Sequence, residues 1–146
     1  MYRREIRACR DPLDFATFVA YFPQLVAGPI SRAKNLLPQI EAHRDRPSGQ
    51  QMLSGLLLIL TGLFKKVVLA DPLAPVVGNA FGGKPNPGPG MVAIGVLAFA
   101  VQIYADFSGY SDMARGTSRL LNIELVHNFD QPYLSRNITE LSLIHI

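Results

Sequence analysis

The chain has 146 residues, of which 49% are hydrophobic and 17% charged, and its formal net charge is +3. This composition favours a helical protein associated with a membrane. No stretch has the 18 or more uncharged apolar residues that would establish a spanning helix, so a soluble helical binding module is an alternative. The single cysteine, Cys9, excludes an intrachain disulfide and a CxxC metal motif. Scattered histidines and basic clusters without interleaved aromatic residues predict neither a metal site nor a nucleic-acid partner.

The first apolar stretch, residues 15–30, is interrupted by Pro23 and by the pair Gly28-Pro29. Proline removes a backbone donor and disfavours helix at the residue before it, so one straight span is excluded. Basic residues flank both ends, and a bent segment would return the chain to the same face of a membrane. We expect a bent helical segment over residues 13–30, then a polar connection over 31–50 with a short helix before Pro38.

A second apolar stretch predicts a long helix near residues 51–69. Lys65 and Lys66 interrupt its apolar surface near the far end, and their long stems would allow the ammonium groups to reach a membrane interface. This segment therefore either spans the membrane or lies partly in its interface. Residues 78–90 are rich in glycine and proline and predict a linker.

A third apolar stretch, residues 91–121, becomes polar halfway along without a helix breaker and predicts a second long helix. At about 100° per residue its polar side chains form two stripes. One stripe contains Gln102, Asp106 and Tyr110, and the other contains Ser108, Asp112, Arg115 and Arg119. After this helix, Asn128, Asp130 and Pro132 suggest a turn, which makes His127 a surface or capping residue rather than a ligand.

The two aspartates of this helix have different surroundings in the sequence. Asp112 precedes Arg115 by three positions and Arg119 by seven, so its charge can be neutralised within its own helix. Asp106 has no cation in reach on its own helix. It therefore needs a partner from another segment, a bound proton or a water-filled cavity. A structural hydrogen bond between helices and a functional site both remain open for Asp106.

The distribution of positive charge predicts a topology for a membrane-bound chain. Residues 1–11, 31–50 and 115–140 contain 11 of the 14 lysines and arginines and are expected on the cytoplasmic side, with residues 76–90 on the other. The fold class predicted from these elements is an all-α, multi-span helical membrane protein fragment without sheet.

Three stretches resemble the membrane-bound O-acyltransferase family, in particular its bacterial alginate O-acetylation branch. They are FPQLVAGPISRAKNLLPQI at 22–40, GLFKKVVLADPLAP at 62–75, and QIYADFSGYSDMARG with NFDQPYLSRNITE within 102–140. The resemblance covers nearly all of residues 2–140, which we therefore interpret as an internal fragment of such a membrane domain. It implies a multi-pass protein of the bacterial inner membrane.

The activity that this resemblance implies is acyl transfer, usually of acetyl, to hydroxyls of an extracytoplasmic polysaccharide such as alginate. It implies a cytoplasmic thioester donor, acetyl-CoA or similar, periplasmic acetylation partner proteins, and a surrounding lipid bilayer. No bound cofactor is expected. A histidine general base would activate the acceptor hydroxyl inside a channel through the bilayer.

The chain departs from the family pattern after Glu140. Where relatives are expected to continue into the stretch with the catalytic histidine, this chain reads LSLIHI, which resembles the translation of a sequencing adapter. We therefore expect residues 141–146 not to be native, assign His145 no role, and expect the 146-residue chain alone to be inactive.

Within residues 1–140 no catalytic residue is expected. The candidates for a channel lining or substrate contact are Asp106, Tyr110, Ser111, Asp112 and Arg136, the last facing an anionic donor. Packing or ion-pair roles remain open for each of them. The alternatives to acetyl transfer are the D-alanyl transfer branch of the same family and a non-enzymatic transporter or assembly subunit in which Asp106 serves a proton or ion path.

Overall fold

The computed structural model describes Cys9, residues 11–25, 31–42, 45–83 and 88–127, Tyr133 and Ser135. Every regular element within these residues is helical, which confirms the all-α prediction for this part of the chain. In chain order the elements are α1 (Pro12–Val19), the 3-10 turn η1 (Phe22–Gln24), α2 (Ala33–Glu41), α3 (Gly49–Phe64), the π-helical segment η2 (Lys65–Ala70), α4 (Asp71–Phe81) and α5 (Pro89–Leu120).

The first segment is bent, as its prolines predict. Asp11 caps α1 by accepting a hydrogen bond from the backbone N–H of Leu13 at 2.8 Å, and Pro12 occupies the first turn, where its missing donor costs nothing. The α-helix ends at Val19, and Pro23 lies in the 3-10 turn that follows. The part of the predicted bend over residues 26–30 lies outside the described residues.

The sequence predicted a short helix that ends before Pro38. In the structure α2 instead continues through Pro38 to Glu41. Pro38 removes one helical hydrogen bond. The burial of Leu36, Leu37 and Ile40 on one face of this helix compensates for that loss, because the helix is held by its packing more than by its backbone.

The second long helix is longer than the sequence suggested. A capping box formed by Ser48 and Gln51 starts α3, and η2 and α4 continue the same rod to Phe81. Pro72 is the second residue after the π-helical segment, so the rod lacks one backbone donor at this point. The linker predicted over residues 78–90 therefore begins only at Gly82. Residues 78–81 stay helical because buried Ala80 packs against Gly95 of α5.

Helix α5 ends in a reversal that was not predicted. The N–H of Ile123 donates to the Ser118 carbonyl at 2.9 Å and that of Asn122 to the Arg119 carbonyl at 3.0 Å, with Asn122 at a φ of 55°. This is a Schellman-type end in which asparagine takes the left-handed position usually held by glycine. The reversal returns Ile123 and Leu125 to a small core with Leu36, Ile40 and Ala114.

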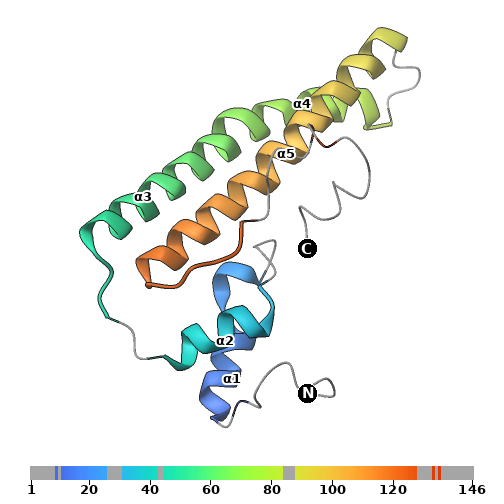
Figure 1. Cartoon of the computed structure of the whole chain (residues 1–146). Coiled ribbons are helices and arrows are strands. Elements are labelled where there is room, and N and C mark those ends of the chain that lie inside the picture. The colour runs from blue at the N-terminus through green and yellow to red at the C-terminus, as the bar shows by residue number, and fades with distance from the viewer. Residues whose placement is uncertain are drawn as a thin grey trace.

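Figure 1 shows α3, η2 and α4 as one rod lying side by side with α5, while α1 and α2 lie near the end of α5. Glycines allow the close approach of the rod and α5. A Cβ added at Gly55 would lie 2.9 Å from the Gly116 carbonyl oxygen, and one at Gly109 would lie 2.8 Å from that of Gly62. Such small-residue contacts bring backbones together as in membrane helix pairs.

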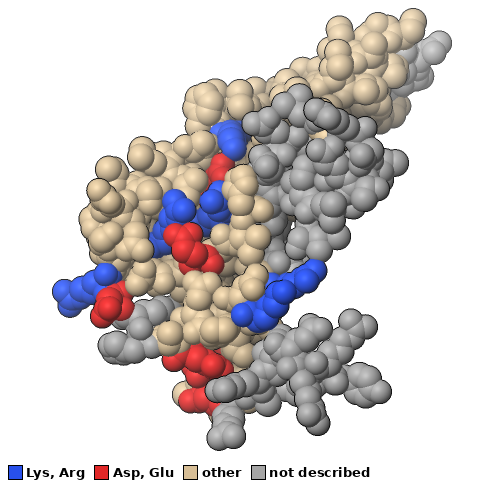
Figure 2. All heavy atoms as spheres, in the orientation of Figure 1, with Lys and Arg blue, Asp and Glu red and all other residues tan. Residues whose placement is uncertain are grey.

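Two helices, Gly49–Phe81 and Pro89–Leu120, are long and apolar enough to cross a membrane, and only 11% and 17% of their most apolar windows are buried. Apolar side chains are exposed on opposite faces of α5, with Leu97 at 71% and Phe99, about 200° further round the helix, at 49%. Both observations fit helices that face lipid or further helices, and they differ from the buried helix of a soluble core. In Figure 2, the end of the molecule formed by α4 and the first half of α5 shows no charged side chain.

Candidate functional site

Two consecutive lysines connect the helical rod to α5. Lys65 and Lys66 begin the π-helical segment η2, and each pairs with a different aspartate of α5. The Lys65 Nζ lies 2.6 Å from Asp112 Oδ2, and the Lys66 Nζ lies 2.7 Å from Asp106 Oδ1. Six residues of helix separate the two aspartates by about 9 Å along α5. π-Helical turns are frequently found at functional sites, and here the turn marks the start of this paired-charge cluster.

The expected ion pair of Asp112 with Arg115 on its own helix is confirmed, but a second and closer partner comes from another helix. Its shortest contact is Lys65 on another helix, whereas Arg115 of its own helix is 3.7 Å away. Arg119 does not contribute, because the reversal after α5 presents Glu124 to its Nε at 2.9 Å. The side chain of Asp112 is 13% exposed, so it is a nearly buried carboxylate with a cation facing each of its oxygens.

The expectation that Asp106 takes a partner from another helix is confirmed by Lys66. That lysine also lies 3.1 Å from Asp71 and so connects two carboxylates. The Asp106 side chain is 52% exposed, in contrast to Asp112. Both lysines thus pair with aspartates, and snorkelling to a membrane interface stays a prediction. In lipid this pairing matters because an unpaired ion is costly there.

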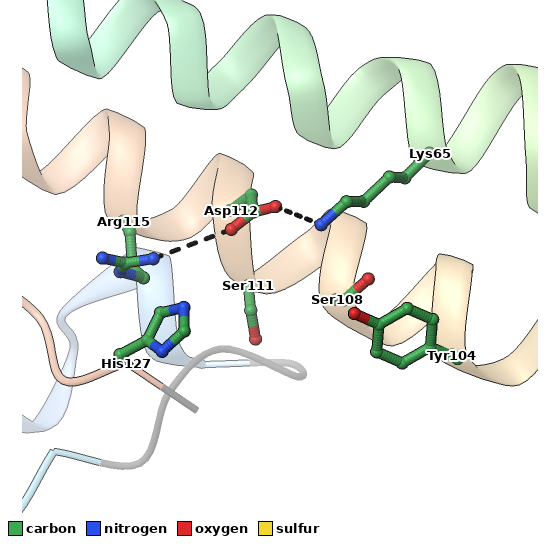
Figure 3. Close-up of a pocket in the computed structure, with 7 residues that line it drawn as sticks. All are labelled: Lys65, Tyr104, Ser108, Ser111, Asp112, Arg115 and His127. Atoms are coloured by element: carbon green, nitrogen blue, oxygen red, sulfur yellow. Dashed lines mark hydrogen bonds and ion pairs between the residues drawn. The ribbon is translucent and has the colours of Figure 1, made fainter. Parts of the chain in front are cut away.

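A small polar cavity of about 30 Å³ adjoins the Lys65–Asp112 pair, with room for little more than one water molecule. Its lining comes from η2, from α5 and from the stretch after α5, as Figure 3 shows. The residues are Lys65, Tyr104, Ser108, Ser111, Asp112, Arg115 and His127. In this view Lys65 reaches Asp112 from the neighbouring helix, and the His127 ring lies near the Arg115 guanidinium. The lining thus contains three fixed charges and the three hydroxyl groups of Tyr104, Ser108 and Ser111.

Three polar atoms in this lining are buried and have no hydrogen-bond partner in the structure. They are the Oγ atoms of Ser108 and Ser111, residues only 2% exposed, and the Nε of Arg115. Hydroxyls further along α5 behave differently, since Thr117 and Ser118 each donate to the carbonyl four residues back at 2.8 Å. Helical hydroxyls commonly make that bond. Ser108 and Ser111 therefore keep their hydroxyls available to the cavity.

The structure separates the predicted site residues. Ser111 and Asp112 lie together in the cavity lining. Tyr110 packs instead against the small core around Leu36, and Asp106 belongs to the other ion pair. Arg136 lies outside the described residues.

Five lining residues were not among the sequence candidates, namely Lys65, Tyr104, Ser108, Arg115 and His127. Ser108 was recognisable, since it shares a helical stripe with Asp112. The only sequence signal for Lys65 was a lysine within an apolar stretch. Its pairing with Asp112 could not be predicted, because the two residues are 47 positions apart. His127 is exposed at the cavity rather than being only a capping residue. Among the described residues, no group of three or more metal-ligating side chains is placed to hold an ion.

Comparison with known proteins gives similar sequences of defined families, although no family model matches the chain. The chain is 41% identical over 140 residues to a probable alginate O-acetylase of Azotobacter vinelandii, which covers 96% of the chain and 28% of that protein. It is 38% identical over 129 residues to a peptidoglycan O-acetyltransferase of Helicobacter pylori, covering 88% of the chain and 24% of that protein. A teichoic acid D-alanyltransferase of Streptococcus thermophilus is 30% identical over 87% of the chain and 32% of its own length.

Two long apolar helices joined by paired charges define the class of this chain as a segment of a helical membrane protein. Together with the 41% identity across almost the whole chain, this places it in the membrane-bound O-acyltransferase family, which its motifs resemble. The matched part of the chain spans 24% to 32% of the length of these relatives.

Proposed function

We propose that the chain is part of a membrane-bound O-acyltransferase that transfers an acetyl group to hydroxyls of an extracytoplasmic polysaccharide. The observation that carries this proposal is the 41% identity over 96% of the chain to a probable alginate O-acetylase. Alginate is accordingly the first acceptor to test. The whole protein crosses the bacterial inner membrane several times, with residues 31–50 and 115–140 on the cytoplasmic side.

In this reaction a histidine elsewhere in the protein takes the proton of the acceptor hydroxyl, whose oxygen attacks the thioester carbonyl of the donor and releases a thiol. The described residues supply part of the channel wall. The Lys65–Asp112 and Lys66–Asp106 pairs support this role, because they place charge between two apolar helices without leaving either aspartate unpaired. The cavity beside Asp112 supplies the hydroxyls of Ser108 and Ser111 as further polar wall.

The test is deletion of the gene followed by measurement of ester-linked acetate on extracellular polysaccharide by proton NMR. We expect acetate to be lost in the deletion strain and restored by the wild-type gene. Unchanged acetate would refute the proposal. Periplasmic partner proteins are tested in the same strain, since co-purification with the wild-type membrane protein would identify them.

The D-alanyl branch is the second candidate, supported by the 30% identity to a teichoic acid D-alanyltransferase. Loss of ester-linked D-alanine, with acetate unchanged, would favour it. Loss of acetyl groups from peptidoglycan alone would favour the acceptor named for the Helicobacter pylori relative. The transporter alternative is less well supported, because Asp106, the residue on which it depends, already forms an ion pair with Lys66.

A further inference from the structure

The cavity beside Asp112 contains hydrogen-bond donors without acceptors. Ser108 and Ser111 present buried hydroxyls, and Arg115 presents a buried Nε–H, all without a partner in the structure. The carboxylate in the lining, Asp112, already faces Lys65 at 2.6 Å and Arg115 at 3.7 Å. An occupant that completes this cavity must therefore bring acceptors.

The fixed charges of the lining also indicate an occupant that brings hydrogen-bond acceptors. Lys65 and Arg115 carry two positive charges against the single negative charge of Asp112, which leaves one positive charge in excess. A water molecule would neutralise none of it and would bring two hydrogens of its own, whereas an anionic oxygen brings none. Hydrogen bonds from a guanidinium and from hydroxyls to a charged oxygen are also stronger than those to a neutral one.

We propose that the cavity formed by Ser108, Ser111 and Arg115 is a binding site for the oxygen atoms of a small anionic group, a carboxylate or a phosphate. The volume of about 30 Å³ admits one or two oxygen atoms of such a group, and the remaining atoms of the ligand must lie outside the cavity. Exposed His127 lies in the lining and marks the side from which the rest of a larger ligand extends.

The proposal rests on the proposed function only for the source of the anion, which would then be an anionic group of the acyl donor. A lipid headgroup carries the same chemistry and is the other source. Binding itself rests on the cavity alone, so it can be tested separately from acyl transfer.

The experiment uses the whole protein in nanodiscs of phosphatidylcholine and measures binding of inorganic phosphate and of acetate by isothermal titration calorimetry. We expect saturable binding of at least one anion by the wild type. The Ser108→Ala/Ser111→Ala variant should bind about a hundredfold more weakly, since each of the two lost hydrogen bonds to a charged group costs about a factor of ten. Thr117→Val is the matched control, because that hydroxyl donates to the Met113 carbonyl and lies outside the cavity, and it should bind as the wild type does.

A second variant tests the contribution of the Arg115 guanidinium to anion binding. Arg115→Lys keeps the charge but removes the fixed fork of donors, so it should also weaken anion binding while Thr117→Val does not. Absence of saturable binding by a wild type that is folded by circular dichroism, or equal affinity in the double variant, would overturn the proposal and leave the cavity to water.

Two further comparisons distinguish a lipid headgroup from a soluble ligand as the source of the anion, and the anion site from the proposed acyl transfer. If nanodiscs with phosphatidylglycerol abolish phosphate binding, the anion is a lipid headgroup, and unchanged binding indicates a soluble ligand. Anion binding without acyl transfer by the same preparation would refute the proposed function and keep this site. Acyl transfer without anion binding would refute the site and keep the function.

Discussion

The close contact between α3 and α5 predicts that Gly109→Ala separates the two helices. The added Cβ would lie 2.8 Å from the Gly62 carbonyl oxygen and 3.2 Å from the Lys65 Cβ, and the first of these is a fixed backbone atom. Restoring an ordinary contact of 3.4 Å requires the helices to move apart by about 0.6 Å at this point. Such overpacking costs about 1 to 3 kcal/mol, whereas alanine gains about 1 kcal/mol over glycine in helix propensity.

Gly78→Ala is the matched control, since Gly78 lies in α4 with nothing within 4 Å of an added Cβ. Because both variants gain the same propensity, Gly109→Ala should be less stable than Gly78→Ala by about 1 to 3 kcal/mol. The assay is sodium dodecyl sulfate titration of the purified chain in detergent micelles, followed by energy transfer between labels on α3 and α5. Equal stability of the two variants, with an unchanged distance between the labels, would refute the packing described here.

The remaining predictions concern charge, topology and activity. Lys65→Met should lower the free energy of unfolding by about 1 to 3 kcal/mol, because it leaves Asp112 facing only the more distant Arg115. This range lies between the values typical of exposed ion pairs and those of fully buried ones. An unchanged unfolding midpoint would contradict the pairing. If Asp106 lines the channel, Asp106→Asn in the whole protein should cut polysaccharide acetylation while the protein level stays near wild type. If its role is structural, protein level and acetylation should fall together. Wild-type acetylation at a wild-type protein level would dismiss both roles. A cysteine introduced within residues 83–88 should react with an impermeant thiol reagent from the periplasmic side, and labelling from the cytoplasmic side alone would reverse the topology. The chain alone should transfer no acyl group, and transfer abolished by His145→Ala would show that residues 141–146 are native after all.

The helices and the bend were predictable because they depend on local features of the sequence. Apolar runs of sufficient length predicted the two long helices, and Pro23 predicted the break after α1. The predicted helix boundaries were wrong where tertiary packing outweighs the local conformational preference of the residues. Pro38 stays helical because its neighbours are buried, and residues 78–81 stay helical because Ala80 packs against Gly95.

The candidate site was predictable only in part, for the same physical reason. Ser111 and Asp112 were identified from the sequence as candidates for a polar lining, and Asp112 lies on a polar stripe of one helix. The pairing of Lys65 with Asp112 joins residues 47 positions apart, and it depends on a π-helical turn that no sequence pattern indicated. His127 reaches the cavity through the reversal after α5, which asparagine rather than glycine makes possible.

The most direct test of the proposed channel wall is acetylation by the Ser108→Ala/Ser111→Ala variant in the deletion strain. These hydroxyls have no partner in the structure, so their removal should leave folding and protein level unchanged. Any loss of activity would therefore report on function. We predict ester-linked acetate about tenfold below wild type at equal protein level, with Thr117→Val at the wild-type value. Wild-type acetylation by the double variant would contradict a role of this cavity in acyl transfer.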